Sequence, residues 1–356
     1  MSDQGFLAYA DVLRGLDFDK FSPNFDVLES SYPSANGKDQ IRLHILVPKS
    51  ISHGQRQRMV PLMVRIHGGY LVTGSSLYAP YFGRWTLQYA IQAGAIIVSP
   101  NYRLLPESNG TEILADMDAF WHWLRGGEVD SILTKSGFES LRVDLEQTLV
   151  MGESSGGYLA MHLMLTYPND IQAVVAVYPV LDLKSDFFTK AYSKPIAGLP
   201  NRPVHVLENH LNKIRSIPRH QLQPVPEADP PDRLELSFAM VQHGRYLEFL
   251  GQDNRRLFPM ERITDEIDAD AAHAGAKLPF MFIFHGKDDR FVPCQGTVHF
   301  IETLAKTRPR ARYHLELQPG DHGFDAPASI ETTTWLRDGL NLTSSAWLKG
   351  KTGCSL

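Results

Sequence analysis

The chain has 356 residues, of which 43% are hydrophobic and 21% are charged, and its formal net charge is −5. One large α/β fold with an insertion can hold this length, and the acidic charge excludes a basic face for nucleic acid. No apolar run is long enough to span a membrane, and two cysteines, Cys294 and Cys354, are too few for a disulfide framework. Residues Met1–Gln4 lack the features of a signal peptide. We therefore expect a cytoplasmic protein without a membrane partner.

Apolar runs of strand length alternate with helix-spaced segments along most of the chain. Residues 25–32 and 41–48 are expected to form two strands joined by an Asn-Gly turn. The other predicted strands are 60–67, 95–99, 148–151, 173–178, 279–285 and 312–317, and the predicted helices are 85–91, 113–124 and 332–348. This alternation predicts a mostly parallel sheet of about eight strands with helices on both faces.

The alternation stops in residues 184–276. Prolines punctuate this segment between 195 and 231, and one helix-like stretch follows, with Leu234, Phe238, Val241 and Leu247 on one face. The segment comes after a predicted strand, at the carboxyl edge where α/β proteins bind ligands. We therefore expect residues 184–276, with about the first thirty residues, to form a cap on a core made of 1–183 and 277–356. The alternative is a packing appendage away from the site.

The most informative motif is Gly152-Glu153-Ser154-Ser155-Gly156. It follows the predicted strand 148–151 and precedes a helix-spaced stretch, 158–166. A strand, a serine with glycine two residues before and after it, and then a helix is the arrangement of a nucleophile elbow, whose strained turn exposes the serine hydroxyl. We interpret Ser154 as a nucleophile. The alternative is a glycine-rich turn with an incidental serine.

A serine nucleophile needs a base and an orienting carboxylate, which in this fold follow in the order serine, acid, histidine. His322 lies on the glycine-containing loop after strand 312–317, and we expect it to be the base. The acidic loop after strand 279–285 supplies Asp289 as the preferred carboxylate. The rival groups are Asp288, Asp321, His285 and His299.

Backbone N–H groups are also needed to bind the oxyanion of the intermediate. We expect them from Gly69 and Tyr70, after strand 60–67, and from Ser155, while Gly68 allows the loop to approach closely. His67 is interpreted as a brace of this loop. The Tyr70 ring has two open roles, contact with substrate and packing under the cap.

Four motifs occur in order and at familiar distances. They are His67-Gly-Gly-Tyr-Leu-Val-Thr-Gly-Ser75, Val98-Ser-Pro-Asn-Tyr-Arg-Leu-Leu-Pro-Glu107, Gly152-Glu-Ser-Ser-Gly-Gly157 and Asp321-His-Gly-Phe324. With them the chain resembles the α/β-hydrolase fold-3 group, the hormone-sensitive-lipase-like esterases, over roughly residues 60–330. The resemblance implies the same roles for Ser154, Asp289 and His322. Tyr70 replaces the family's usual third glycine and is similar to the pattern of kynurenine-formamidase-like relatives.

We therefore predict a serine hydrolase that forms an acyl-enzyme from a carboxylic ester of small or medium size and partly hydrophobic character. We expect no cofactor, and no metal because no metal-ligand spacing occurs. The resemblance suggests detoxification or secondary metabolism, and a homodimer because relatives are often dimers. An amidase or formamidase, a thioesterase and a lyase on the same triad remain open, as does a non-catalytic ligand-binding protein.

Overall fold

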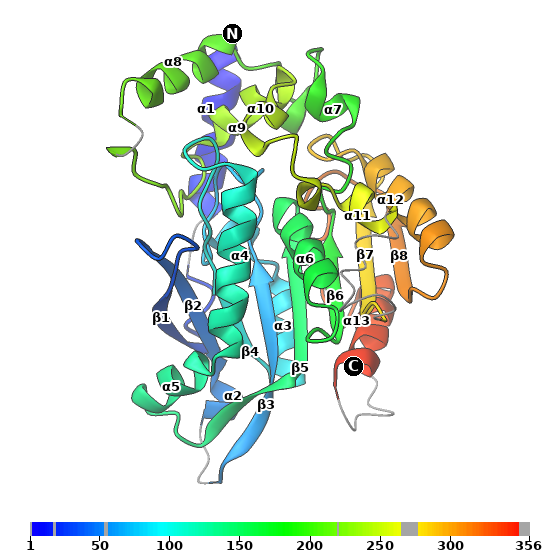
Figure 1. Cartoon of the computed structure of the whole chain (residues 1–356). Coiled ribbons are helices and arrows are strands. Elements are labelled where there is room, and N and C mark those ends of the chain that lie inside the picture. Colours follow the sequence, from blue (N-terminus) through cyan, green and yellow to red (C-terminus); the bar gives the residue numbers. More distant parts are fainter. Residues whose placement is uncertain (1, 17–18, 53–55, 219–220, 265–276, 349–356) are drawn as a thin grey trace.

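The computed structural model describes residues 2–16, 19–52, 56–218, 221–264 and 277–348 (Figure 1). Its strands form an eight-stranded sheet in the order β1-β2-β4-β3-β5-β6-β7-β8. The strands are β1 (Phe25–Pro33), β2 (Gln40–Pro48), β3 (Arg58–Ile66), β4 (Ile96–Pro100), β5 (Leu141–Glu153), β6 (Ala173–Val177), β7 (Phe280–Gly286) and β8 (Tyr313–Gln318). β2 pairs antiparallel with β1 and β4, and all other pairs are parallel. The predicted fold class, a mostly parallel sheet of about eight strands, is confirmed.

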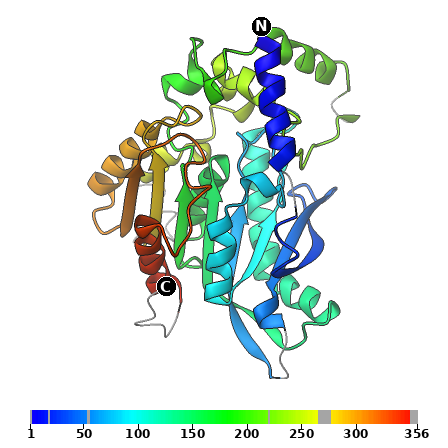
Figure 2. The same ribbon diagram turned by 180° about the vertical axis from the view of Figure 1, so that it is seen from behind.

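Alternate side chains of the strands pack against helices on opposite faces of the sheet. Val64 and Val150 belong to the core on one face, whereas Met63 and Leu149 belong to the core on the other. The helices around the sheet are α2 (Lys49–Ser52), α3 (Arg84–Ala93), α4 (Gly110–Arg125), α5 (Glu128–Lys135), α6 (Ser155–Thr166), α12 (Cys294–Thr307) and α13 (Thr334–Trp347). Figures 1 and 2 show α4 and α6 on one face and α3 and α13 on the other.

Several elements differ from their predicted bounds for local reasons. Helix α4 begins at Gly110 because Asn109 and Glu112 form a capping box, in which each side chain accepts a hydrogen bond from the other residue's backbone N–H. The predicted helix-like stretch from Leu234 is divided in two, because Gly244 lies between the halves at φ 66°. Helices α1 (Ser2–Leu16), α5, α8 (Val204–Arg215) and α12 were not predicted, and neither were the short helices α2, α7 (Asp186–Thr189) and α11 (Pro259–Thr264).

A layer of helices lies above the carboxyl ends of the parallel strands (Figure 1). It combines α1 (Ser2–Leu16) with α7 (Asp186–Thr189), α8 (Val204–Arg215), α9 (Leu234–Gln242) and α10 (Tyr246–Leu250). The Phe6 and Tyr9 rings of α1 lie 6.2 and 6.4 Å from the Phe238 ring of α9, so the N-terminal helix packs on the insertion. Parts of the predicted cap, 219–220 and 265–276, lie outside the described residues.

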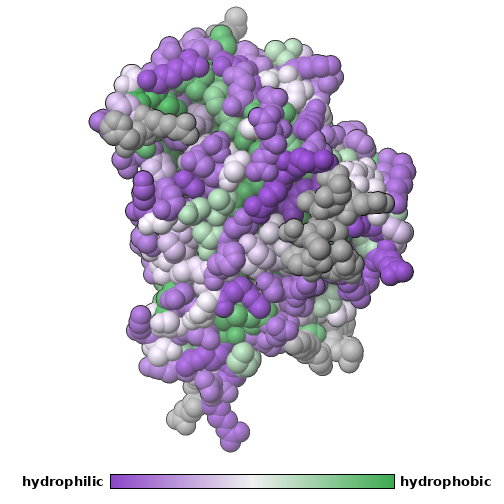
Figure 3. Space-filling view, in the orientation of Figure 1, coloured by the Kyte–Doolittle hydropathy of each residue, from purple (hydrophilic) through white to green (hydrophobic). Residues whose placement is uncertain are grey.

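The surface and the cysteines add three observations. The face in Figure 3 is largely hydrophilic, with some hydrophobic groups visible at its upper end. Among the described residues, no helix combines the length and the apolar character that crossing a bilayer requires. Cys294 is a buried free thiol, and Cys354 lies outside the described residues.

Candidate active site

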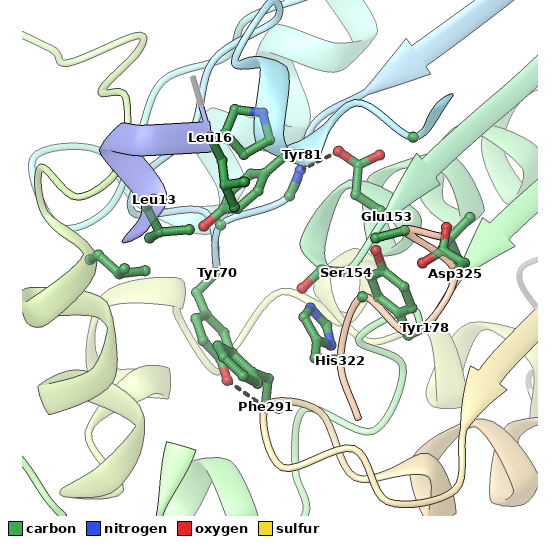
Figure 4. Close-up of a pocket in the computed structure, with 18 of the residues that line it drawn as sticks. Leu13, Leu16, Tyr70, Tyr81, Glu153, Ser154, Tyr178, Phe291, His322 and Asp325 are labelled. Carbon is green, nitrogen blue, oxygen red and sulfur yellow. Dashed lines mark hydrogen bonds between the residues drawn. The ribbon is translucent and has the colours of Figure 1, made fainter. Parts of the chain in front are cut away.

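The sheet brings the predicted site residues to one edge, because the carboxyl ends of parallel strands meet there. The His67–Tyr70 loop follows β3, Ser154 follows β5, Asp289 comes after β7, and His322 after β8. Ser154 and His322 both line a cavity of about 190 Å³. Figure 4 shows the Ser154 hydroxyl directed toward the His322 ring.

Ser154 occupies a strained turn between β5 and α6. Its backbone has φ 57° and ψ −121°, a combination that L-residues rarely adopt. A Cβ atom at Gly152 would lie 2.3 Å from the Gly156 carbonyl oxygen, and one at Gly156 would lie 2.1 Å from the Ile66 carbonyl oxygen. The turn therefore requires glycine on both sides of the serine, and it presents the hydroxyl to the cavity.

The His322 ring is held by the Asp289 carboxylate. Its Nδ1 lies 2.7 Å from Oδ2 of Asp289. The other carboxylate oxygen, Oδ1, accepts hydrogen bonds of 2.8 Å from the N–H groups of Phe291 and Val292. Burial raises the pKa of Asp289, but the neighbouring His322 and His285 outweigh it and hold the pKa well below its ordinary range. An ionised Asp289 fixes the proton on Nδ1 of His322, which leaves Nε2 able to accept a proton from Ser154.

The rival carboxylates have other partners. Oδ2 of Asp288 accepts a hydrogen bond of 3.0 Å from the Gly320 N–H group. Asp321 accepts bonds from Arg290, at 2.8 Å from its backbone N–H and 2.6 Å from its Nε, and it also accepts the backbone N–H of His322. Neither carboxylate bonds to the imidazole ring in the described chain.

The rival histidines lie outside the cavity lining. The buried His285 ring has Nδ1 2.8 Å from the Thr297 hydroxyl and Nε2 2.9 Å from the Val292 carbonyl oxygen. His299 is exposed, with Nδ1 3.3 Å from Asp182. His285 therefore supports the loop that carries Asp289, and His299 belongs to the α12 surface.

The loop after β3 turns sharply beside Ser154. Gly69 has φ 114°, and a Cβ atom there would lie 2.0 Å from the Thr73 carbonyl oxygen. The Gly68 N–H group donates to Oε1 of Glu153 at 3.2 Å, so it is not free to bind substrate. His67 lies under this loop, with Nδ1 2.8 Å from the Gly68 carbonyl oxygen, and burial lowers its pKa to about 3. A neutral, buried His67 fits the role of a brace.

Three backbone donors remain at the mouth of this turn. In the part of the chain that the structure describes, the N–H groups of Gly69, Tyr70 and Ser155 have no hydrogen-bond partner. Unsatisfied N–H groups next to a nucleophile are the donors that an oxyanion hole needs. The Tyr70 ring lines the cavity, its hydroxyl donates to the Phe291 carbonyl oxygen, and its own carbonyl accepts the Tyr246 hydroxyl at 2.7 Å. Tyr70 thus both borders the cavity and packs under the helices above it.

Sequence reasoning missed three polar groups of the cavity, Glu153, Tyr178 and Asp325. Glu153 forms a buried ion pair with Arg65, and burial outweighs that pair and raises its pKa to about 7. Asp325 accepts a 2.7 Å hydrogen bond from Nε1 of Trp85, and burial raises its pKa. Glu153 adjoins Ser154, and Tyr178 directly follows β6 at the sheet edge, so their positions could have identified them.

The remaining lining is mainly apolar and aromatic. Helix α1 contributes Tyr9, Leu13 and Leu16, α9 contributes Leu234 and Phe238, and the core contributes Tyr81, Trp85 and Phe291. No cluster of His, Cys, Asp and Glu side chains suited to a metal ion occurs among the described residues.

The chain is similar to several known proteins. A family model described as alpha/beta hydrolase fold matches residues 63–232. The probable carboxylesterase M8 of Phoma sp. is 31% identical over 293 residues, which cover 82% of this chain and 87% of that protein. The non-reducing polyketide synthase mapC' of Penicillium brevicompactum is 25% identical over 331 residues, covering 82% of this chain and 14% of that protein. A solved structure described as a bacterial heroin esterase matches with a TM-score of 0.59 at 17% identity, covering 96% of this chain and 90% of that chain, which bears on the fold alone.

Proposed function

This chain belongs to the alpha/beta hydrolase family and hydrolyses esters, and we propose that it is a serine carboxylesterase with Ser154 as nucleophile, His322 as base and Asp289 as orienting acid. The observation that carries this assignment is the 2.7 Å contact between His322 and Asp289 beside a serine in a strained elbow. The chain needs no cofactor for this chemistry.

The proposed reaction has two steps. His322 Nε2 takes the Ser154 proton as the hydroxyl oxygen attacks the ester carbonyl carbon, and the imidazolium then protonates the departing alcohol. Water, deprotonated by the same ring, cleaves the acyl-enzyme and releases the acid. The N–H groups of Gly69, Tyr70 and Ser155 bind the oxyanion in both steps, and each is expected to lower the barrier by about 3 kcal/mol.

The cavity limits the size of the reacting group. Its volume of about 190 Å³ is close to that of a cavity of roughly 150 Å³ that admits benzene. We assign α1 and the described part of residues 184–276 to a cap, because α1 and α9 supply much of the apolar lining. The substrate is accordingly a small or medium-sized, partly hydrophobic ester.

A thioester substrate is the second candidate, favoured by the similarity to a polyketide synthase over 82% of the chain. The same similarity supports a place in secondary metabolism. Ser154 would attack a thioester carbonyl in the same way, with a thiolate as the leaving group. The Tyr70 variant of the oxyanion loop keeps formamides as a third class.

A substrate panel tests these proposals together. An aryl ester, the matching thioester and the matching anilide, at equal concentrations, are incubated with the wild-type protein and with Ser154→Ala. We expect ester turnover to exceed anilide turnover, and all turnover to depend on Ser154. A variant that hydrolyses the ester at the wild-type rate contradicts the serine mechanism, and faster cleavage of the thioester or anilide reassigns the substrate class.

A further inference from the structure

Three polar side chains form one wall of the cavity. Glu153, Tyr178 and Asp325 lie together on one side of Ser154 and His322, while Tyr70, Phe291 and Leu13 lie on the other (Figure 4). The Tyr178 ring centroid is 4.2 Å from that of His322. A substrate group on this wall is therefore next to the reacting atoms.

This wall offers both hydrogen-bond acceptors and a donor. Oε1 of Glu153 accepts hydrogen bonds from Arg65 and from the Gly68 N–H group, and Oδ2 of Asp325 accepts one from Trp85. Asp325 is also hydrogen-bonded to the Tyr178 hydroxyl. Burial and the nearby carboxylates, Asp325 foremost, raise the pKa of Tyr178 well above its ordinary value, so its hydroxyl keeps its proton. A ligand hydroxyl that enters between Tyr178 and Asp325 can donate to the carboxyl group and accept the hydrogen bond that Tyr178 otherwise gives to Asp325.

The charges of the wall select against ionic ligands. The cavity lining contains no Lys or Arg side chain among the described residues, so an anionic group would face Glu153 and Asp325 without a counter-ion. A fixed cation would lie beside His322, which becomes positively charged as it takes the Ser154 proton, and would raise the energy of that state. A neutral donor avoids both costs.

The neighbouring rings favour a planar group. Trp85 and Tyr81 line the cavity beside the polar wall, and the Trp85 N–H group already orients Asp325. Offset stacking and edge-to-face contacts with such rings suit an aromatic ligand. The cavity volume of about 190 Å³ accommodates one ring with a few substituent atoms.

We propose that Glu153, Tyr178 and Asp325 form a subsite that binds the hydroxyl group of a phenolic ring, so that the enzyme prefers esters of hydroxylated single-ring aromatic compounds. This rests on the proposed function. The phenolic hydroxyl donates to Asp325 and accepts from Tyr178, in place of the hydrogen bond between these two side chains, and Glu153, held by Arg65, borders the same wall.

Matched substrates test the subsite. The first series compares 3-hydroxyphenyl acetate with 3-methoxyphenyl acetate, in which the ring lies on the alcohol side of the ester. The second compares methyl 3-hydroxybenzoate with methyl 3-methoxybenzoate, in which the ring lies on the acyl side. Because a buried hydrogen-bonding group left without a partner costs about 1–3 kcal/mol, kcat/KM in one series should favour the hydroxyl compound by roughly 5- to 150-fold. In each series, the analogue with a 3-carboxyl group in place of the 3-hydroxyl group should be the poorest substrate.

Variants of the wall identify the residues responsible. Asp325→Asn keeps an acceptor for Trp85, and Tyr178→Phe removes one hydroxyl, so both should bring the hydroxyl-to-methoxy ratio close to 1. Glu302→Gln, on the exposed face of α12, is the matched acidic control and should leave the ratio unchanged. A wild-type ratio near 1 in both series, or a ratio that neither wall variant alters, overturns the subsite.

Binding separates this proposal from the proposed function. Phenol and anisole are titrated into Ser154→Ala by calorimetry, where no turnover is needed. Tighter binding of phenol, lost in Ser154→Ala/Asp325→Asn, supports the subsite even if no ester is hydrolysed, in which case the proposed function alone fails. Equal affinity for phenol and anisole overturns the subsite whatever the esterase activity is.

Discussion

The two neighbouring carboxylates Asp288 and Asp289 allow a matched test of the proton relay. In Asp289→Asn, the amide oxygen stays on the N–H groups of Phe291 and Val292, which hold Oδ1 at 2.8 Å. The amide NH₂ group then faces the N–H group on Nδ1 of His322, so two hydrogen-bond donors point at each other. To relieve this conflict the imidazole must carry its proton on Nε2, and it can then no longer accept the Ser154 proton.

The expected loss follows from that change of tautomer. The same substitution in a serine protease triad lowers kcat roughly 10⁴-fold, which corresponds to about 5.5 kcal/mol of transition-state stabilisation. Asp288→Asn can keep its hydrogen bond from the Gly320 N–H group, so we expect less than a threefold change. Steady-state hydrolysis of p-nitrophenyl acetate measures both, with circular dichroism as the check of folding.

Two results would refute this reasoning. A folded Asp289→Asn enzyme within tenfold of the wild-type kcat/KM would show that Asp289 does not orient the base. An equal loss in Asp288→Asn would show that the loop, and not one carboxylate, is what the substitutions disturb.

Two further predictions concern stability. Gly156→Ala places a Cβ atom 2.1 Å from the Ile66 carbonyl oxygen, so we expect a loss of about 3 kcal/mol or more in the free energy of unfolding by urea. Gly15→Ala is the control, because a Cβ atom there has no atom within 4 Å, and it should be neutral or slightly stabilising. Similar losses in both variants would contradict the steric account. The Glu107 carboxylate accepts bonds of 3.0 Å from His210 and Arg233; although burial raises its pKa, these partners lower it to about 2. A carboxyl pKa that is lowered by folding stabilises the folded state at pH values above the unfolded pKa of about 4.5. Glu107→Gln should therefore lower the free energy of unfolding by about 2–3 kcal/mol at pH 7, and its difference from wild type should shrink as the pH falls from about 4.5 toward 2. A difference that does not change with pH would contradict the ionic origin.

The sequence predicted the parts of the fold that have a local signal. Buried parallel strands such as β7 are continuous apolar runs, and the Ser154 turn requires its glycines, so both could be identified without coordinates. Helix α12 has its buried residues Thr297, Phe300, Ile301 and Leu304 at helical spacing, so it too carries a local signal. By contrast, the position of α1 is set by contacts with α9, which lies more than two hundred residues away, and no local pattern specifies that contact.

The polar wall of the cavity shows where sequence reasoning ends. Glu153 has its environment set by Arg65, 88 positions away, and Asp325 by Trp85, 240 positions away. Such pairings depend on how the sheet brings loops together, and no local pattern specifies them. That Ser154, Asp289 and His322 lie at one edge of the sheet was predictable, because each follows a recognisable strand.

The most direct test of the account is covalent labelling of the nucleophile. The wild-type protein is treated with a fluorophosphonate, digested and analysed by mass spectrometry, in parallel with Ser154→Ala. We predict a single phosphonylated peptide carrying the adduct on Ser154, full loss of esterase activity on labelling, and neither labelling nor activity in the variant. An adduct on another residue, or an unlabelled wild-type protein that still hydrolyses esters, would contradict the proposed serine mechanism.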